Sequence, residues 1–247
     1  MREPVDFLGI PIVPWTTDEF EMWITDRASD TKGQRPVFVT YLNAWCSNVA
    51  ARDPEYADIL RAADAVYADG QAVVWASALL RRPVPERVNA ADFIVDLCQR
   101  FARAGVSIYL LGSQDGVAAR AAEALTRQAP GLRVVGAAGG YWSDNGSAAA
   151  AAVAAARPDV LLVGLGVPMQ EKWAWSRRPE FHARVIWCVG AMFEYFGGAR
   201  ARAPRWVRRA GLEWLFRLIL EPRRLWRRYL VGNAVFVWRV LCGWLAG

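Results

Sequence analysis

The sequence predicts an α/β fold, with a Rossmann-like, mostly parallel sheet, flanking helices and a C-terminal helical appendage. Three observations lead to this prediction. Short apolar runs alternate with alanine-rich stretches of helical character, a pattern typical of βα units around a parallel sheet. Polar or glycine-rich residues follow most of the runs, where ligands of such sheets bind. Beyond residue 200 the alternation stops and the chain becomes basic and aromatic.

The body of the chain contains both kinds of element in alternation. Strands are predicted at the apolar runs 37–40, 66–68, 106–111, 132–135, 160–163 and 185–189. Helices are predicted over 48–61, 72–80, 91–104, 118–128 and 147–156. Because carboxyl ends of parallel strands share one edge of a sheet, the residues after these strands are where we expect the chemistry.

The 247 residues fit one large domain or a domain with an extension, since single cores stop growing at roughly 250–300 residues. We expect a body of residues 1–199 and an appendage of residues 200–247. The appendage has 11 arginines against Glu213 and Glu221, a net charge of +9. The whole chain carries +6, so the body carries −3. This polarity favours an enzyme that uses a soluble compound at one site and an anionic lipid at another.

The end of the appendage is predicted to lie on a bilayer. Residues 229–245 are strongly apolar, but Asn233, Arg239 and two glycines interrupt them, and a spanning helix needs about 20 apolar residues. The alternative, a C-terminal helix that packs on the body, stays open. The first residues lack the basic and apolar regions of a secretory signal, which predicts a cytoplasmic protein, peripheral on the inner face of the cell membrane.

Metal and disulfide chemistry have no support in the sequence. The four cysteines are far apart and form no CxxC pair, no Asp-x-Asp occurs, and the single histidine, His182, has no spaced companions. We therefore expect no metal site and no cofactor.

Three segments carry candidate chemistry. Asp69 follows an apolar strand and precedes Gly70, where a carboxylate can act as a general base; an Asp-Gly turn or a helix cap is the alternative. Gln170 follows the glycine-bearing loop 164–168 and can hydrogen-bond to a nucleobase or sugar. That loop lacks the third glycine of a dinucleotide fingerprint, so support for an NAD enzyme is weak. Arg87 is a candidate partner for a diphosphate.

These segments belong to a longer series of motifs. In chain order the series is Leu42-Asn43-Ala44, Tyr67-Ala68-Asp69-Gly70, Pro85-Glu86-Arg87-Val88, Tyr109-Leu110-Leu111-Gly112, Gly139-Gly140-Tyr141, residues 164–173, Arg202-Ala203-Pro204-Arg205-Trp206 and residues 211–229. On these motifs, which span nearly everything from Val37 to Tyr229, the chain resembles the WecG/TagA/CpsF family of bacterial glycosyltransferases.

The resemblance implies an inverting, metal-independent transfer of a sugar. The donor would be a UDP-sugar, of the N-acetylmannosamine type or a related hexose, and the acceptor a polyprenyl-diphosphate-linked sugar in cell-surface polysaccharide biosynthesis. By the same resemblance Asp69 would deprotonate the acceptor hydroxyl and Arg87 would offset charge on the leaving diphosphate. The remaining donor-pocket residues would be Thr40, Asn43, Gln170 and Glu194.

The resemblance also gives the appendage a role. Arg217, Arg224 and Arg227 or Arg228 are spaced by about two turns and one turn of a helix, so they would converge on the acceptor diphosphate unless Pro222 kinks the helix. General attraction to anionic headgroups is the alternative, at about 1 kcal/mol for each arginine. Some residues depart from the family pattern around the donor pocket, among them Met169 and Glu194, so the donor sugar stays open.

Two other function classes make distinct predictions. A nucleotide-cofactor oxidoreductase would bind NADH tightly, and a nucleic-acid binder using the basic end would show strongly salt-dependent DNA affinity. Leucine, valine and tryptophan interleaved with the arginines suit lipid better than nucleic acid. A homo-oligomer is possible, because an exposed apolar tail needs cover when no membrane is present.

Overall fold

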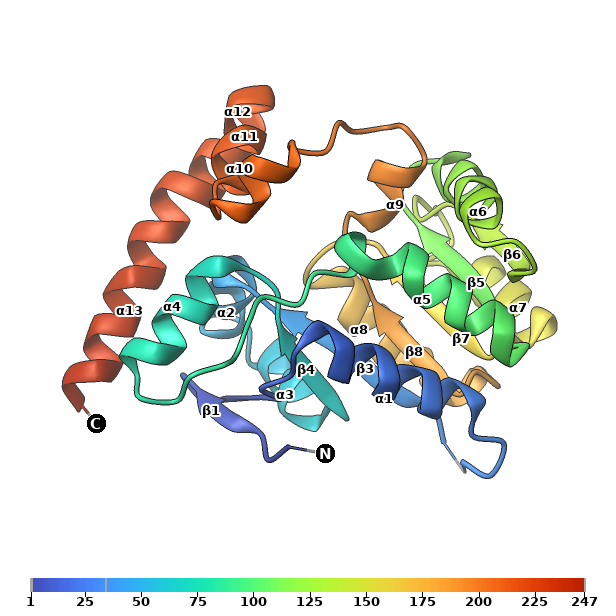
Figure 1. The fold of residues 1–247 in the computed structure, drawn as a ribbon, viewed down its shortest axis with the longest axis horizontal. Helices are drawn as coiled ribbons and strands as arrows, with labels where there is room; N and C mark the ends of the chain where they lie inside the picture. The colour runs from blue at the N-terminus through green and yellow to red at the C-terminus, as the bar shows by residue number, and fades with distance from the viewer. Residues whose placement is uncertain (1, 34, 247) are drawn as a thin grey trace.

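A computed structural model describes residues 2–33 and 35–246 of the chain. Its centre is a six-stranded, all-parallel sheet in the order β4-β3-β8-β7-β5-β6 (Figure 1). The strands are β3 (Val37–Leu42), β4 (Ala65–Ala68), β5 (Ser107–Gly112), β6 (Arg133–Ala138), β7 (Val160–Gly164) and β8 (Val185–Cys188). The predicted fold class is confirmed.

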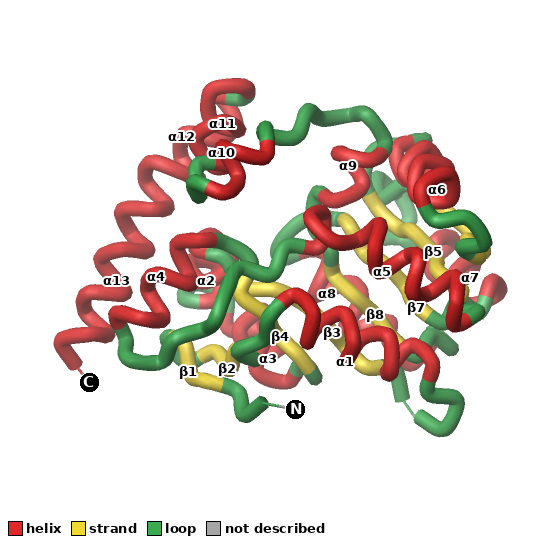
Figure 2. The backbone as a smooth tube through the Cα atoms, viewed as in Figure 1, coloured by secondary structure: helices red, strands yellow, loops and turns green. Residues whose placement is uncertain are grey.

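Helices cover both faces of the sheet (Figure 2). Strand β7 is buried on both sides: Val160 and Leu162 join one apolar core, and Leu161 and Val163 join the other. The first core includes side chains of α1 (Thr17–Ser29), α5 (Ala90–Ala104) and α6 (Val117–Gln128). The second includes side chains of α7 (Ser147–Ala156) and α8 (Met169–Arg177). Burial on both faces explains why the strands are continuous apolar runs rather than alternating patterns.

The predicted elements hold, with one helix split in two. The segment predicted as a helix over 48–61 forms α2 (Ala44–Ala50) and α3 (Pro54–Ala62). The first helix ends at Ala50, and Asp53 caps the second, because its Oδ1 accepts a hydrogen bond from Tyr56 N and Pro54 occupies the first turn. The single-helix prediction was therefore wrong at this position.

The first 36 residues contain elements that the sequence patterns did not predict. Strands β1 (Val5–Phe7) and β2 (Ile10–Ile12) pair antiparallel in a small separate sheet. Helix α1 begins at a capping box, in which Thr16 and Glu19 bond to each other's backbone N–H groups. The strands are too short for a periodic pattern to show, whereas the capping box was a readable signal.

In the described part of the appendage, the regular structure that follows residues 201–204 is helical. After α4 (Gln71–Leu79) in the body and α9 (Met192–Phe196) at its edge, an extended connection leads into α10 (Arg205–Arg209), α11 (Glu213–Leu220), α12 (Pro222–Trp226), the π-helical turn Arg227–Val231 and α13 (Gly232–Ala246). Figure 1 shows α13 running beside α4 and α2, away from the six-stranded sheet. Within the described residues, none of the helices combines the length and apolar character that crossing a bilayer demands.

Helix α13 packs on the body with one face and leaves the other exposed. Phe236 and Val240 enter the main core, and Phe236 stacks on Phe7 with ring centroids 6.2 Å apart. Arg239 Nη1 donates to Ser47 O at 2.7 Å. Trp238 points the other way and is 68% exposed. One side of α13 therefore packs on the body, as the alternative left open by the sequence has it. The other side stays exposed.

Candidate active site

One cavity of about 910 Å³ lies between the carboxyl ends of the strands and the appendage. Its wall from the body consists of residues that follow the strands: Asn43 after β3, Asp69 and Gly70 after β4, Ser113 after β5, Gly164–Val167 at the end of β7, and Gly190 after β8. The opposite wall comes from α10 to α13. This is the sheet edge where the sequence placed the chemistry.

Asp69 lines this cavity in a constrained turn. Its backbone N–H donates to Leu42 O at 2.9 Å, and its Oδ1 accepts a hydrogen bond from Asn89 Nδ2 at 2.7 Å. Gly70 has φ +141°, which residues with a Cβ rarely adopt, and a Cβ there would lie 3.4 Å from Asn43 Cβ. Glycine at this position lets the chain leave the strand and present the carboxylate to the cavity.

Burial raises the pKa of Asp69 to about 6. The charge of Arg87 and the hydrogen bond from Asn89 oppose this rise, whereas the charges of Glu213 and Asp92 add to it. A carboxylate with this pKa is ionised at neutral pH yet is a stronger base than an ordinary aspartate. The environment therefore suits proton abstraction.

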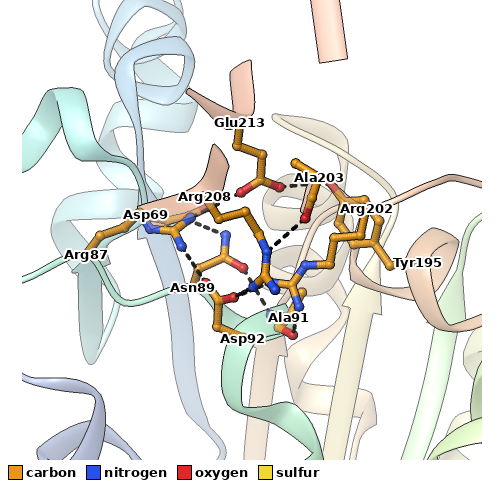
Figure 3. Close-up of polar contacts among 10 residues, drawn as sticks. All are labelled: Asp69, Arg87, Asn89, Ala91, Asp92, Tyr195, Arg202, Ala203, Arg208 and Glu213. Atoms are coloured by element: carbon orange, nitrogen blue, oxygen red, sulfur yellow. Dashed lines mark hydrogen bonds and ion pairs between the residues drawn. The ribbon is translucent and has the colours of Figure 1, made fainter. Parts of the chain in front are cut away.

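Arg87 belongs to an ionic network that joins the body to the appendage (Figure 3). Its guanidinium pairs with Asp92 and lies 3.3 Å from Glu213 Oε2. Asp92 also accepts from Arg202, at 2.5 Å, and from Arg208. Three arginines against two carboxylates leave this network with a net charge of 3 − 2 = +1. Arg87 therefore lines the cavity, but it already has two acidic partners.

The four appendage arginines predicted to meet a diphosphate all line the cavity: Arg217, Arg224, Arg227 and Arg228. They do not share one helix, because α11 ends at Leu220 and α12 starts at Pro222, after an extended Glu221. The helix is interrupted at Pro222, which is the alternative that the sequence left open, and Arg217 reaches the cavity from a separate helix.

Two of these arginines have buried, unpaired donors. The Nε atoms of Arg217 and Arg228 find no hydrogen-bond partner among residues 2–33 and 35–246. Arg228 stacks near the ring of Trp45, 5.4 Å from its centroid, and Arg224 is paired with Glu221 at 2.5 Å. Buried guanidinium donors without partners are costly, which suggests that an anionic ligand completes them.

Thr40 and Gln170 are placed differently from the other predicted residues. Both are fully buried and neither lines the cavity. Thr40 Oγ1 and Gln170 Nε2 both donate to Glu171 Oε1, at 2.9 and 2.7 Å, and Gln170 Oε1 accepts from Gly190 N at 3.0 Å. In this structure they hold Glu171 and the Gly190 turn behind the cavity wall, so the predicted direct contact with a donor lacks a geometric basis here.

Asn43 and Glu194 do reach the cavity. Asn43 Oδ1 also accepts from Cys46 N at 3.0 Å and so caps α2. Glu194 pairs with Arg200 at 2.5 Å, and Arg200 also contacts Glu221 at 3.0 Å. Both side chains are thereby fixed in place, one by a helix cap and the other by an ion pair that reaches the appendage.

Several residues of the site were missed by the sequence patterns. Asn89 holds Asp69 and also caps α5, a role that its place before an apolar helix could have indicated. Ser113 has φ +61° and a buried hydroxyl without a partner among the described residues, at the cavity wall. Glu213 contacts both Arg87 and Tyr195 from the appendage. The pairing of Glu213 with Arg87 spans 126 residues and leaves no local sequence signal.

No metal-binding cluster occurs in the part of the chain that the structure describes: it contains no group of three or more His, Cys, Asp or Glu side chains arranged to hold an ion. The positive charge beside Asp69 comes from arginines. These are the groups available to stabilise an anionic leaving group.

Comparison with known proteins identifies the family of the chain. The family model described as "Glycosyl transferase WecG/TagA/CpsF family" matches residues 5–247. A protein of Bacillus spizizenii is 32% identical over 193 residues, 78% of this chain and 74% of the relative. One from Bacillus subtilis is 31% identical over 192 residues, 78% of this chain and 74% of that relative. One from Staphylococcus aureus is 28% identical over 205 residues, 83% of this chain and 79% of the relative.

All three relatives are named N-acetylglucosaminyldiphosphoundecaprenol N-acetyl-beta-D-mannosaminyltransferase. The match confirms the predicted enzyme class, a hexosyltransferase, and sets aside the oxidoreductase and the nucleic-acid binder. From the fold, the cavity and this match over nearly its whole length, the chain belongs to the WecG/TagA/CpsF family of glycosyltransferases.

Proposed function

We propose that this enzyme transfers a sugar from a UDP-sugar to a polyprenyl-diphosphate-linked N-acetylglucosamine, by inversion and without a metal ion. The observation that carries the proposal is the placement of Asp69, in one cavity with unpaired arginines from the appendage. The relatives' names supply the acceptor class and favour an N-acetylmannosamine-type donor.

The proposed reaction is a single displacement. The free oxygen of the Asp69 carboxylate takes the proton of the acceptor hydroxyl, and the hydroxyl oxygen forms a bond to the anomeric carbon as the bond to the UDP oxygen breaks. Attack from the side opposite UDP inverts the anomeric centre. The departing diphosphate keeps the bonding electron pair, and the net positive network around Arg87 offsets its charge.

The donor pocket is proposed at the strand ends. Asn43 and Glu194 line it directly, whereas Thr40 and Gln170 act from behind the wall through Glu171 and Gly190. The acceptor diphosphate is proposed to lie on the appendage side, where the buried Nε donors of Arg217 and Arg228 have no hydrogen-bond partner among the described residues. Arg224 and Arg227 complete this cationic wall.

The acceptor chain requires contact with a membrane. The basic appendage and the exposed apolar side of α13 support a peripheral location on the inner face of the cell membrane. A UDP-sugar is soluble and the acceptor is lipid-linked, so a cavity between body and appendage lets the two meet at a bilayer surface.

The test is a transfer assay with a panel of UDP-sugars and a synthetic polyprenyl-diphosphate N-acetylglucosamine, with and without a metal chelator. We expect one donor to be consumed at the same rate in both conditions. In the Asp69→Asn variant the rate should fall by about 10²–10⁴-fold, because the base is gone, while UDP binding is retained. Turnover of Asp69→Asn near the parental rate would contradict the assignment of the base.

A further inference from the structure

The cavity that holds Asp69 also has an apolar wall, built by two helices. Helix α4 contributes Ala72, Trp75, Ala76 and Leu79, and helix α13 contributes Phe236, Val237, Val240 and Leu241. On each helix these positions recur at helical spacing, so each set forms one stripe. Figures 1 and 2 both show the two helices side by side. We call the space between the two stripes the apolar groove.

The groove exposes large apolar side chains. Trp75 is 62% exposed and Val237 is 53% exposed, while Phe236 and Val240 are buried beneath them. Neither stripe contains a charged residue, and the single charge of α13, Arg239, is directed to Ser47 on α2. The polar lining residues of the two helices, Gln71 and Asn233, lie in their first turns, and the surface beyond them is apolar. Exposed apolar surface of this kind inside a cavity is typical of a site for a hydrocarbon.

The groove continues from the arginines. Arg224, Arg227 and Arg228 precede α13 along the chain and line the same cavity. From Arg228 to Leu241 the helical rise amounts to roughly 20 Å. Trp75 reaches the appendage as well, since a Cβ placed on Gly211 would lie 3.6 Å from its Cη2. A cationic end and a long apolar wall thus follow one another within a single cavity.

We propose that the apolar groove between α4 and α13 binds the first isoprene units of the acceptor, while the appendage arginines hold its diphosphate. This assignment rests on the proposed function. The occupant follows from charge complementarity: a diphosphate joined to a hydrocarbon chain matches unpaired guanidinium donors joined to an apolar groove. The bilayer itself is met by outward side chains such as Trp238, which lie outside the cavity.

The experiment measures chain-length preference by calorimetric titration of the full chain, without vesicles, with farnesyl diphosphate and dimethylallyl diphosphate. The parent is expected to bind the longer ligand at least about tenfold more tightly, because more apolar surface is buried. Leu79→Gln and Leu241→Gln should each reduce this ratio markedly and leave the affinity for the short ligand unchanged. Arg217→Gln should weaken both ligands.

Trp238→Gln is the matched control, since Trp238 is on the same helix but outside the groove; it should keep the parental ratio. Thermal unfolding of each variant checks that it folds. Equal affinities in the parent, or a parental ratio in both groove variants, would overturn the proposal. So would a parental dimer that the groove variants convert to a monomer, because a second copy would then occupy the groove. A chain-length preference without sugar transfer to any acceptor would instead refute the proposed function and leave the groove assignment standing.

Discussion

Asn89 serves two structures with one side chain. Its Nδ2 donates to Asp69 Oδ1 at 2.7 Å, and its Oδ1 accepts from Ala91 N at 3.2 Å to cap α5. The start of α5 and the orientation of the Asp69 carboxylate therefore depend on the same side chain. The hydrogen bond also lowers the pKa of Asp69 against the effect of burial, so the basicity of the site depends on this neighbour.

Asn89→Ser is predicted to move the acid limb of the rate profile to higher pH. Serine can still cap α5, but it is too short to reach Asp69. Losing a hydrogen bond to the ionised form raises the pKa of Asp69 above its value of about 6, so a larger share of the enzyme is protonated and inactive near neutral pH. The measurement is kcat/KM against pH. Asn233→Ser, at another position on the cavity wall, should leave the limb in place; an identical profile for Asn89→Ser would contradict the prediction.

Among the site residues, those adjacent to strand ends were predictable and those held by distant partners were not. Asp69 follows from its place after an apolar run, and Asn43 was implied by the family resemblance. The same rule put Gln170 at the sheet edge, but it does not specify which way a side chain faces, and Gln170 turns inward to Glu171. Asp92 and Glu213 become part of the site only through chain segments that the fold brings together.

At the scale of elements, the turn from β4 to α4 controls the site. Gly70 opens α4 with φ +141°, and no side-chain cap is present. A helix that begins this abruptly brings Asp69 and the first residue of the apolar groove, Ala72, to one cavity wall.

Gly70→Ala is predicted to destabilise the fold by about 1–3 kcal/mol, because alanine is strained at this φ. Activity should fall as well, since the turn carries Asp69. Urea unfolding gives the free energy. Gly232→Ala is the matched control: Gly232 has an ordinary helical φ of −63° and its added Cβ would meet nothing closer than 3.7 Å, so the change should be neutral or stabilising by up to about 1 kcal/mol. Equal effects of the two substitutions would refute the argument.

The elements of the body were predictable because buried parallel strands are short, uniform apolar runs. The failures have local causes. Asp53 and Pro54 divide a stretch whose apolar pattern looks continuous, and Glu221 adopts an extended conformation that ends α11 before Pro222. The packing of Phe236 on Phe7 joins segments more than 200 residues apart, and no local pattern encodes it.

For the whole molecule, a buried acid links stability to pH. Glu171 is fully buried, with Oε2 lacking a partner among the described residues, and burial raises its pKa from 4.5 to about 7. The folded state therefore holds this proton more tightly than the unfolded state. Below the unfolded pKa the Glu171 carboxyl is protonated in both states and does not make the free energy of unfolding depend on pH. As the pH rises from there through about 7, the unfolded state gives up this proton first, so the folded protein loses stability.

Glu171→Gln is predicted to remove this pH dependence. The free energy of unfolding of the parent, minus that of the variant, should fall by up to about 3 kcal/mol between pH 4.5 and pH 8. Urea unfolding at a series of pH values measures the difference. Glu180→Gln, on the exposed surface, should show no such trend. A flat difference for Glu171→Gln would mean that the buried acid titrates normally.

Membrane contact is predicted to depend on the outer side of α13 together with the arginines. Removing residues 200–247 should release the protein from anionic vesicles and strongly impair catalysis. Because Phe236 and Val240 are part of the core, the sharper variant keeps the chain whole and replaces the exposed Trp238 and Leu245 by glutamate. The fraction of protein that sediments with anionic vesicles should fall for this variant. For the parent it should fall when the salt concentration is raised. Undiminished sedimentation of both altered proteins would exclude the appendage as the contact.

The two walls of the cavity are also made at different times. Translation at about 5–20 residues per second separates the synthesis of Leu79 from that of Leu241 by roughly ten seconds or more. Throughout that interval the nascent body carries Phe7 without the ring that later stacks on it, and Trp75 without a facing helix. Until α13 has left the ribosome and docked, the cavity lacks its second apolar wall, and the emerging chain exposes apolar surface that the finished protein covers.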